Sequence, residues 1–306
     1  MRPLIIGARG SSLSLCQTRL VQATLEARVP ARRFELKTIK AKADEHPEAS
    51  LAAIAGEGVF VKELEAALMR GEVDLAVHSM KDLPLQIPEQ LVVAAITERD
   101  DPRDALISQR GTLFRDLPAG SRIGTSSLRR RSQVLCLRSD LQMVDIRGNV
   151  DTRLRKLDEG RYDAIVVAAC GVIRLGLEAR IADYFRLEEL LPEPGQGALA
   201  IETRADDADV RTLVATVEDE TARTCVMAER AMLGVLGGGC RVPIAAFAQV
   251  EGDEVVVQGA VVAPDGSRMI RDSLRGPAIS ASIVGETLGR TLLARGAGEL
   301  LDQVSR

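Results

Sequence analysis

A single cysteine, Cys240, follows three consecutive glycines at positions 237–239 and precedes Arg241, Val242 and Pro243. Glycine permits backbone conformations that other residues avoid, and it leaves room for a bulky group beside the thiol. Proline fixes the direction in which the chain leaves the loop. The pattern suits covalent attachment or attack at Cys240. The loop taken alone, however, favours a glycine-rich helix end followed by a small buried cysteine.

A second group of residues could bind anions. The segment 124–131 places hydroxyl side chains and then arginines directly after a short predicted strand. A helix N-terminus, hydroxyl groups and guanidinium groups together favour a carboxylate or a phosphate over a merely solvated basic helix face. Two further predicted strands, ending near residues 146 and 168, are also followed by arginine. We therefore expect a polyanionic ligand held by Arg129, Arg130, Arg147, Arg153 and Arg174.

Two weaker signals lie in the first part of the chain. Arg9 and Ser11 occupy a loop between a strand and a helix, where backbone N–H groups favour anions, although a plain turn explains the loop equally well. Lys81 and Asp82 follow a buried strand at 73–77, and open α/β sheets bind ligands at such strand ends. A neighbouring lysine keeps the aspartate ionised. The pair alone is more simply a surface ion pair.

Composition excludes several classes of protein. The chain has 306 residues, a net charge of -4, 2% aromatic residues and no tryptophan, which argues against a general nucleic-acid binder. Five scattered cysteines without a CxxC pair predict free thiols in a reducing compartment, and two histidines are too few for a histidine metal cluster. The N-terminus lacks a signal-peptide pattern, and the apolar run 164–170 is too short to span a membrane. We expect a cytoplasmic protein.

Hydrophobic periodicity predicts an α/β fold of three domains. Domain 1 is expected at 1–97 and 198–215, domain 2 at 103–191 and domain 3, a small α+β domain, at 218–306. Ser12 is expected to cap a helix ending before Pro30, and the strand 198–202 is expected to return to the first lobe. The other predicted strands are 4–6, 91–96, 164–168, 244–250, 254–262 and 269–274, and the other predicted helices include 206–214, 221–236 and 279–295.

Taken together, the motifs resemble the porphobilinogen deaminase family, also called hydroxymethylbilane synthase. The similarity covers nearly the whole chain, and several long segments in one order are far more specific than any single short motif. The segments are 60–65 (FVKELE), 76–84 (AVHSMKDLP), 124–130 (GTSSLRR), 147–153 (RGNVDTR), 191–197 (LPEPGQG) and 238–243 (GGCRVP).

The resemblance implies a transferase (EC 2.5.1.61) that joins four porphobilinogen units head to tail, releases ammonia at each step and yields 1-hydroxymethylbilane for tetrapyrrole and heme biosynthesis. The product grows on a dipyrromethane cofactor joined by a thioether to Cys240. Each pyrrole carries an acetate and a propionate, which agrees with the polyanion expected from the arginines. The resemblance also implies two lobes with the type II periplasmic-binding-protein fold and mixed sheets, an active site in the cleft between them, and a monomer without metal, membrane or nucleic-acid partners.

The family's functional residues map onto positions of this sequence. Asp82 matches the catalytic aspartate, which stabilises a cationic azafulvene and shuttles protons. The positions implied to hold the cofactor, besides Cys240 and Asp82, are Ser79, Lys81, Thr125, Ser127, Arg129, Arg130 and Gly148. The positions implied to hold the substrate and the growing chain are Arg9, Ser11, Arg147, Arg153 and Arg174.

The chain departs from the family pattern in the segment 42–58, which the resemblance implies to be a lid. Glu57 stands where lysine is common, and Ala53 stands where some members have a second basic residue. A lid with less positive charge is expected to contact a polyanion more weakly, with catalysis retained. Comparing the turnover of Glu57→Lys with that of the native protein tests this expectation.

Two other functions are compatible with parts of the sequence. A non-catalytic two-lobed carboxylate-binding or sensor protein would explain the arginines but leaves Cys240 and the third domain without a role. A phosphate-binding enzyme would use residues 125–130, but the chain has no Walker lysine pattern and no acidic metal cluster. Intact-mass spectrometry separates these alternatives, because only the enzyme would carry two linked pyrroles on Cys240.

Overall fold

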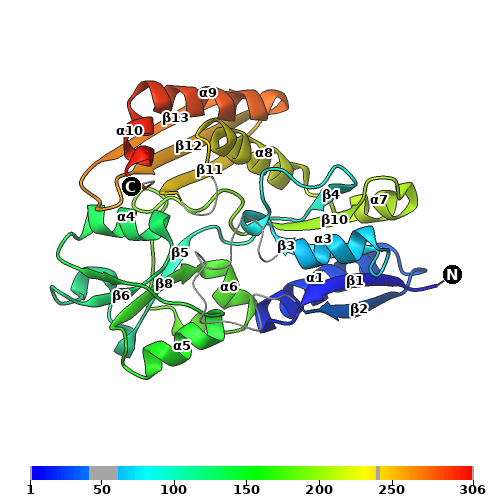
Figure 1. The fold of residues 1–306 in the computed structure, drawn as a ribbon, viewed down its shortest axis with the longest axis horizontal. Coiled ribbons are helices and arrows are strands. Elements are labelled where there is room, and N and C mark those ends of the chain that lie inside the picture. The colour runs from blue at the N-terminus through cyan, green and yellow to red at the C-terminus, as the bar shows by residue number, and fades with distance from the viewer. Residues whose placement is uncertain (1, 41–60, 239–241, 305–306) are drawn as a thin grey trace. The chain divides into compact units, whose positions relative to one another are not determined.

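The computed structural model describes residues 2–40, 61–238 and 242–304 (Figure 1). The chain forms two compact units, one made of Met1–Asp100 with Gly197–Arg223 and the other of Asp101–Gln196 with Thr224–Arg306. The predicted α/β class is confirmed, with two five-stranded mixed sheets and one three-stranded antiparallel sheet among the described residues.

The first unit is built on a sheet with the strand order β2-β1-β3-β10-β4. Strands β1 (Leu4–Arg9), β2 (Phe34–Ile39) and β3 (Leu75–Ser79) run parallel. Strand β10 (Leu199–Arg204) lies antiparallel between β3 and β4 (Leu91–Ile96). The prediction that a strand near residue 200 returns to the first lobe is therefore confirmed.

Side chains alternate along these strands and fill two cores on opposite faces of the sheet. Leu4 and Ile6 pack with helix α1 (Ser12–Arg28), whereas Ala76 packs with helix α3 (Lys62–Met69). Helix α7 (Ala208–Val214) adds Val210 and Val214 to the α1 side. Covering both faces leaves the ends of the strands as the places where polar side chains can gather.

The second unit contains a sheet with the strand order β7-β6-β8-β5-β9. Strands β6 (Arg122–Gly124), β7 (Gln142–Val144) and β8 (Ala164–Ala168) are parallel, while β5 (Asp104–Ser108) lies antiparallel to β8 and to β9 (Asp183–Tyr184). Helices α4 (Leu128–Leu137), α5 (Val150–Asp158) and α6 (Ala169–Arg174) each begin within a few residues of the end of one parallel strand. Each parallel strand therefore delivers its loop and a helix N-terminus to the same sheet edge.

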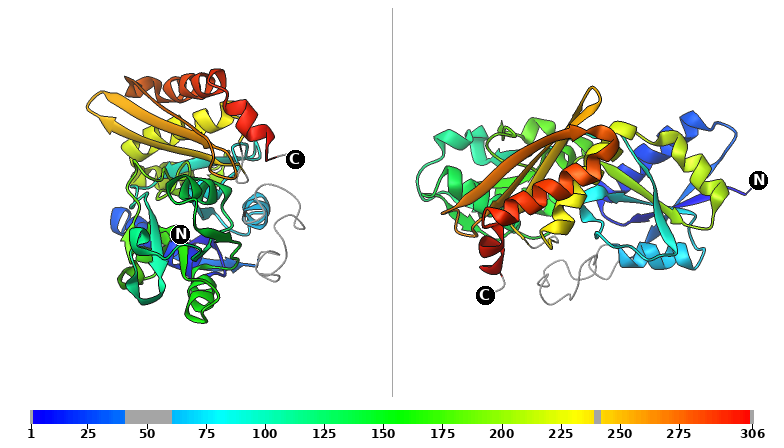
Figure 2. Two further views of the ribbon diagram at one scale, coloured as in Figure 1. Left: turned by 90° about the vertical axis from the view of Figure 1, so that its left-hand side faces the viewer. Right: turned by 90° about the horizontal axis from the view of Figure 1, so that it is seen from above.

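The same unit carries the antiparallel sheet of β11 (Ile244–Glu251), β12 (Glu254–Val262) and β13 (Met269–Pro277). Helices α8 (Glu220–Val235), α9 (Ala281–Ala294) and α10 (Ala297–Asp302) cover this sheet, and Figure 2 shows α9 lying along it. Helices α8 and α9 cross closely because Gly285 lies against the backbone of Ala228, where a side chain would not fit.

The structure corrects several local predictions. The N-cap of α1 is Ser11 rather than Ser12, since the Ser11 hydroxyl accepts the N–H of Ser14. Strands β2, β5 and β9 were not anticipated from the sequence pattern. The three-domain boundaries stay a prediction. In the described parts of the chain, no helix combines the length and the apolar character that crossing a membrane requires.

Candidate functional site

The first unit brings five of the predicted site residues to one edge of its sheet. Parallel strands β1 and β3 are neighbours, and they end at Arg9 and Ser79. Ser11 caps the helix that follows β1, while Lys81 and Asp82 lie in the turn that follows β3. This carboxyl edge of parallel strands is where open α/β sheets bind ligands.

The turn that carries Asp82 is held by its backbone. Met80 to Asp82 form one turn of 3-10 helix. The Met80 N–H ties this turn to the segment before β10 by donating to the Ala198 carbonyl at 3.0 Å. Met80 and Leu83 are buried, whereas Lys81 and Asp82 between them are half-buried. Apolar anchors on both sides therefore fix the backbone and leave the Asp82 carboxylate near the surface.

Ser79 and Ser11 are both connected to helix α1. The Gln17 side-chain amide donates to the Ser79 hydroxyl at 3.0 Å. The Ser11 hydroxyl accepts the Ser14 N–H at 3.3 Å, and the Ser14 hydroxyl accepts the Arg9 N–H at 3.1 Å. The Ser11 hydroxyl keeps its own hydrogen for donation to a ligand.

Three titratable side chains are buried directly behind this edge. His78 precedes Ser79 on β3, and its Nε2 lies 3.0 Å from a carboxylate oxygen of Glu202 on β10. Glu65 on α3 is also buried. Burial raises the pKa of Glu65, and neighbouring Glu202 raises it further, whereas His78 and Lys62 act in the opposite direction. The sequence reasoning did not single out this cluster.

In the second unit, the loops after β6 and β7 are joined by Ser126. Its hydroxyl donates to the Ile146 carbonyl at 2.8 Å and accepts the Ile146 N–H at 3.1 Å. Thr125 extends the contact, since its N–H donates to the Val144 carbonyl at 2.9 Å. Ser127 is the N-cap of α4 and accepts the Arg130 N–H. The predicted residues Thr125 and Ser127 thus lie in one connected pair of loops.

Gly148 and the remaining predicted arginines extend the same sheet edge. Gly148 has a φ of 106°, which an L-residue rarely adopts, and its carbonyl accepts Arg153 Nε at 2.8 Å. Arg147 and Arg153 flank the start of α5, and Arg174 ends α6 after β8. All three arginines are half-buried. The predicted delivery of arginines by successive strand ends is therefore seen in the geometry, while their roles stay a prediction.

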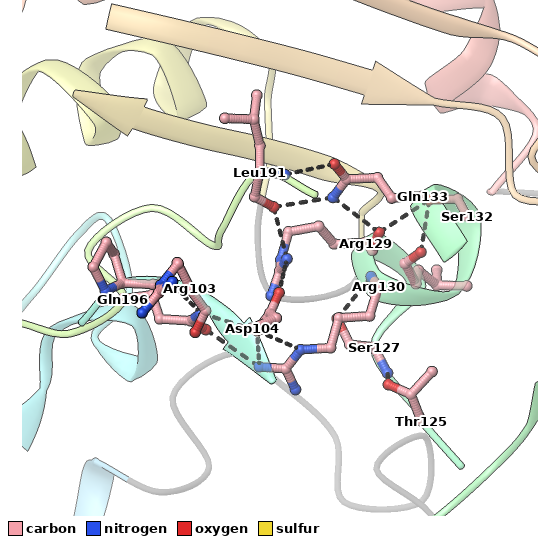
Figure 3. Close-up of polar contacts among 12 residues, drawn as sticks. Arg103, Asp104, Thr125, Ser127, Arg129, Arg130, Ser132, Gln133, Leu191 and Gln196 are labelled. Atoms are coloured by element: carbon pink, nitrogen blue, oxygen red, sulfur yellow. Dashed lines mark hydrogen bonds and ion pairs between the residues drawn. The ribbon is translucent and has the colours of Figure 1, made fainter. Parts of the chain in front are cut away.

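Arg129 and Arg130 point inward from α4 to one buried carboxylate, that of Asp104 at the start of β5 (Figure 3). Arg129 Nη1 donates to Asp104 at 2.6 Å, and Arg130 Nε donates to the other oxygen at 2.9 Å. The three side chains are almost completely buried. Burial alone would raise the pKa of Asp104, but the two guanidinium groups hold it well below its usual range.

Two buried glutamines complete this network (Figure 3). The Gln196 amide donates to Asp104 at 2.9 Å and accepts from Arg130 at 3.2 Å. Gln133 exchanges two hydrogen bonds with the backbone of Leu191, whose carbonyl also accepts Arg129 Nη1 at 2.8 Å. Two residues of the motif 191–197, Leu191 and Gln196, are therefore part of the arginine site.

One edge of the Arg129 guanidinium group takes no part in the network. Arg129 Nε and Nη2 are buried and have no hydrogen-bond partner among the described residues. Buried donors of a cation are costly when unpaired. Two guanidinium charges also face the single negative charge of Asp104. The Glu193 carboxylate adds a longer-range electrostatic attraction to Arg130. The arrangement fits an acetate or propionate group of a dipyrromethane, which would supply both a negative charge and planar acceptor oxygens.

Sequence reasoning missed Asp104, Gln133 and Gln196. Gln196 belongs to the motif 191–197, which the sequence analysis used only for the family resemblance, and Asp104 lies at the end of the densely charged segment 98–104. Nothing in local spacing pairs Asp104 with arginines 25 and 26 positions later. Cys240, Ala53 and Glu57 lie outside the described residues. Within residues 2–40, 61–238 and 242–304, no group of His, Cys, Asp and Glu side chains could hold a metal ion.

Comparisons with known proteins agree with this geometry. Residues 4–212 match the family model described as porphobilinogen deaminase, dipyromethane cofactor binding domain, and residues 223–294 match that of the porphobilinogen deaminase C-terminal domain. The porphobilinogen deaminase of Geobacter metallireducens is 48% identical over 99% of this chain and 95% of its own length. That of Syntrophobacter fumaroxidans is 44% identical over 100% of this chain and 99% of its own.

A solved structure, the periplasmic aliphatic sulphonate binding protein SsuA from Escherichia coli, is 16% identical, with a TM-score of 0.40 over 76% of this chain and 70% of its own. The family models and the full-length relatives, in contrast, cover both the arginine network and the third sheet. On these matches, the chain belongs to the porphobilinogen deaminase family.

Proposed function

We propose that this chain is a hydroxymethylbilane synthase (EC 2.5.1.61), which joins four porphobilinogen units head to tail with release of ammonia. The observation that carries the proposal is the buried arginine network, in which two nitrogens of Arg129, Nε and Nη2, have no partner among the described residues and could donate to an anion. A family model for a dipyrromethane cofactor domain covers this network and the Asp82 turn. Porphobilinogen carries two carboxylates, so substrate and cofactor both suit such donors.

The residues of the second unit would bind and orient carboxylates. Arg129 and Arg130 would hold the cofactor's acid side chains, with Thr125, Ser127 and the backbone at Gly148 as further donors. Arg147, Arg153 and Arg174, which are half-buried at the same edge, would hold the acids of the substrate and of the growing chain. When bound, the dipyrromethane supplies the free pyrrole carbon to which the first substrate unit is joined.

The residues of the first unit would carry the chemistry. We assign Asp82 as the catalytic residue, because an ionised carboxylate on a rigid turn can stabilise the positive charge that develops on the substrate as ammonia leaves. The same oxygens can hold the proton that the attacking pyrrole loses. Ser79 and Lys81 would orient acid groups beside Asp82, while Arg9 and Ser11 would bind substrate at the neighbouring strand end.

The attachment of the cofactor is proposed at Cys240, which follows α8 and the glycines. We further propose that the enzyme works as a cytoplasmic monomer, as the sequence resemblance implies.

Intact-mass spectrometry of the purified protein tests the proposal. The native chain is expected to exceed its sequence mass by that of two linked pyrroles, and Cys240→Ser is expected to lose this increment. Ammonia release from porphobilinogen then separates the enzyme from a carboxylate-binding or sensor protein. A native chain of unmodified mass that releases no ammonia would contradict the proposal and favour the binding protein.

A further inference from the structure

We propose that Gln133 is a positioning residue that sets the carboxylate-binding edge of Arg129 through the backbone of Leu191. This inference rests on the proposed function and deepens it, because it names how the arginine site is oriented for a ligand. The Gln133 side-chain amide bonds backbone groups only in these contacts, those of Arg129 on α4 and of Leu191. Its effect on a ligand would therefore be exerted through the Arg129 guanidinium group.

The side-chain amide of Gln133 forms two hydrogen bonds with the backbone of Leu191. The Gln133 amide nitrogen donates to the Leu191 carbonyl at 3.0 Å, and its amide oxygen accepts the Leu191 N–H at 2.9 Å. Both residues are buried, at 1% and 0% exposed. The side-chain amide therefore satisfies the backbone donor and the backbone acceptor of one residue, which fixes that peptide segment against α4.

Leu191 is in turn hydrogen-bonded to the side chain of Arg129 (Figure 3). The Leu191 carbonyl accepts Arg129 Nη1 at 2.8 Å, and the same nitrogen donates to Asp104 at 2.6 Å. A guanidinium group is planar and rigid, so two acceptors at one nitrogen set the orientation of the whole fork. The other edge, formed by Nε and Nη2, keeps no partner among the described residues. The position of the Leu191 carbonyl, together with that of Asp104, therefore sets the direction in which Arg129 Nε and Nη2 point.

On the side away from Arg129, Leu191 is held by the antiparallel sheet. Its side chain packs with Ala245, Phe247 and Ala260 of the antiparallel sheet, and the next carbonyl, of Pro192, accepts the Ala246 N–H at 3.0 Å. The segment is therefore fixed by β11 and β12 on one side and by Gln133 on the other. Removing the Gln133 amide would free the backbone only on the side that faces Arg129.

Two substitutions at Gln133 separate orientation from packing. Gln133→Met keeps the size of the side chain but removes both hydrogen bonds to Leu191. Gln133→Glu keeps an acceptor for the Leu191 N–H, loses the donor, and places a carboxylate oxygen against the Leu191 and Arg129 carbonyls, which repel it. Ser132→Ala is the matched control, because Ser132 is buried on the same helix and its hydroxyl donates to the Leu128 and Arg129 carbonyls, not to the backbone of Leu191.

The first readout is the rate at which protein made without porphobilinogen acquires the two-pyrrole mass after porphobilinogen is added. We expect this rate to fall about tenfold in Gln133→Met, because a misdirected Arg129 would lose a hydrogen bond to the ligand carboxylate. One hydrogen bond to a charged group contributes on the order of that factor. We expect at least the same loss in Gln133→Glu. Ser132→Ala is expected to load at the native rate.

The second readout distinguishes positioning from general stability. For each variant, the Tm of the loaded protein is compared with that of the same variant carrying Cys240→Ser. A merely structural role would lower both Tm values together and leave their difference unchanged, since the difference reports the ligand. We expect the difference to shrink in both Gln133 variants and to stay native in Ser132→Ala.

The outcomes are distinguishable. If native protein loads the adduct and both Gln133 variants load at the native rate with a native Tm difference, the positioning role is wrong and the proposed function stands. If native protein never gains the mass, the proposed function is wrong and this inference fails with it. If Gln133→Met does not fold, Gln133→Glu decides the result, because it retains one of the two bonds to Leu191.

Discussion

Asp104 and Arg129 form a buried ion pair with 2.6 Å between the carboxylate oxygen and Nη1, and their side chains are 0% and 3% exposed. The same carboxylate pairs with Arg130, so one acid compensates two bases. Such a pair gains little net stability over apolar packing, but breaking it leaves an uncompensated charge in the interior. The carboxylate therefore fixes the positions of two buried guanidinium groups, which we propose to bind an anionic ligand.

Replacement of Asp104 by Asn is therefore expected to lower the free energy of unfolding by about 3–5 kcal/mol, as measured by urea denaturation of the Cys240→Ser background. Asp140→Asn is the control. Asp140 also makes two hydrogen bonds with one arginine, Arg138, but that pair is solvent-accessible and is expected to contribute about 0–1 kcal/mol. Equal losses in the two variants would show that burial of the Asp104 pair has no special energetic effect.

The effect of Asp104→Asn is also expected to depend on pH. Because the pKa of Asp104 is lowered in the folded state, its contribution is present above the unfolded pKa of about 3.9 and is lost as pH falls below it. The difference in unfolding free energy between native protein and Asp104→Asn should shrink as pH is lowered from about 5 towards 3. A difference that grows over this range would contradict the assigned sign.

Replacement of Asp82 by Asn is expected to reduce the rate of ammonia release by about 10²–10⁴-fold, because the amide can neither stabilise positive charge nor take up a proton. The Tm should change little, since Asp82 is half-buried on a turn fixed by Met80 and Leu83. Asp116→Asn is a matched control, because Asp116 also ends a single 3-10 turn after a basic residue. Native turnover in Asp82→Asn would overturn the catalytic assignment.

The buried glutamate behind the Asp82 turn gives a second pH-dependent prediction. The pKa of Glu65 is raised in the folded state, so its stabilising contribution is complete below the unfolded pKa and is lost as pH rises through the folded pKa. Glu65→Gln stays neutral, although Glu202, His78 and Lys62 still face it. Relative to native protein, Glu65→Gln should gain unfolding free energy as pH rises above the unfolded pKa of about 4.3. Urea denaturation at several pH values measures this, and a constant difference would contradict it.

The crossing of α8 and α9 predicts a strong effect of one methyl group. A Cβ at Gly285 would overlap the Ala228 backbone, so Gly285→Ala should lower the free energy of unfolding by about 1–3 kcal/mol or more. Gly298→Ala, in α10, meets only Leu293 at 3.9 Å and should raise stability by about 0.5–1 kcal/mol, as expected for Gly to Ala in a helix. Thermal unfolding compares the two, and a neutral Gly285→Ala would show that the helices can separate without cost.

The sequence was sufficient for the family, for the α/β class and for most long elements, because their apolar periodicity is strong. It predicted β4, β8 and β12 with the bounds that the structure has. It missed β9, which has two residues, and β2, in which Phe34 alone is buried. It also missed Asp104, because an ion pair between β5 and α4 is set by sheet topology and has no signature in local spacing.

The order of strands in the first sheet has a consequence during synthesis on the ribosome. Strands β3 and β4 leave the ribosome early, but the strand that pairs with both, β10, is made about a hundred residues later. Until residue 204 has emerged, the edges of β3 and β4 that β10 later covers stay unpaired, and unpaired edges are prone to non-native association. The chain therefore cannot complete its N-terminal unit in sequence order.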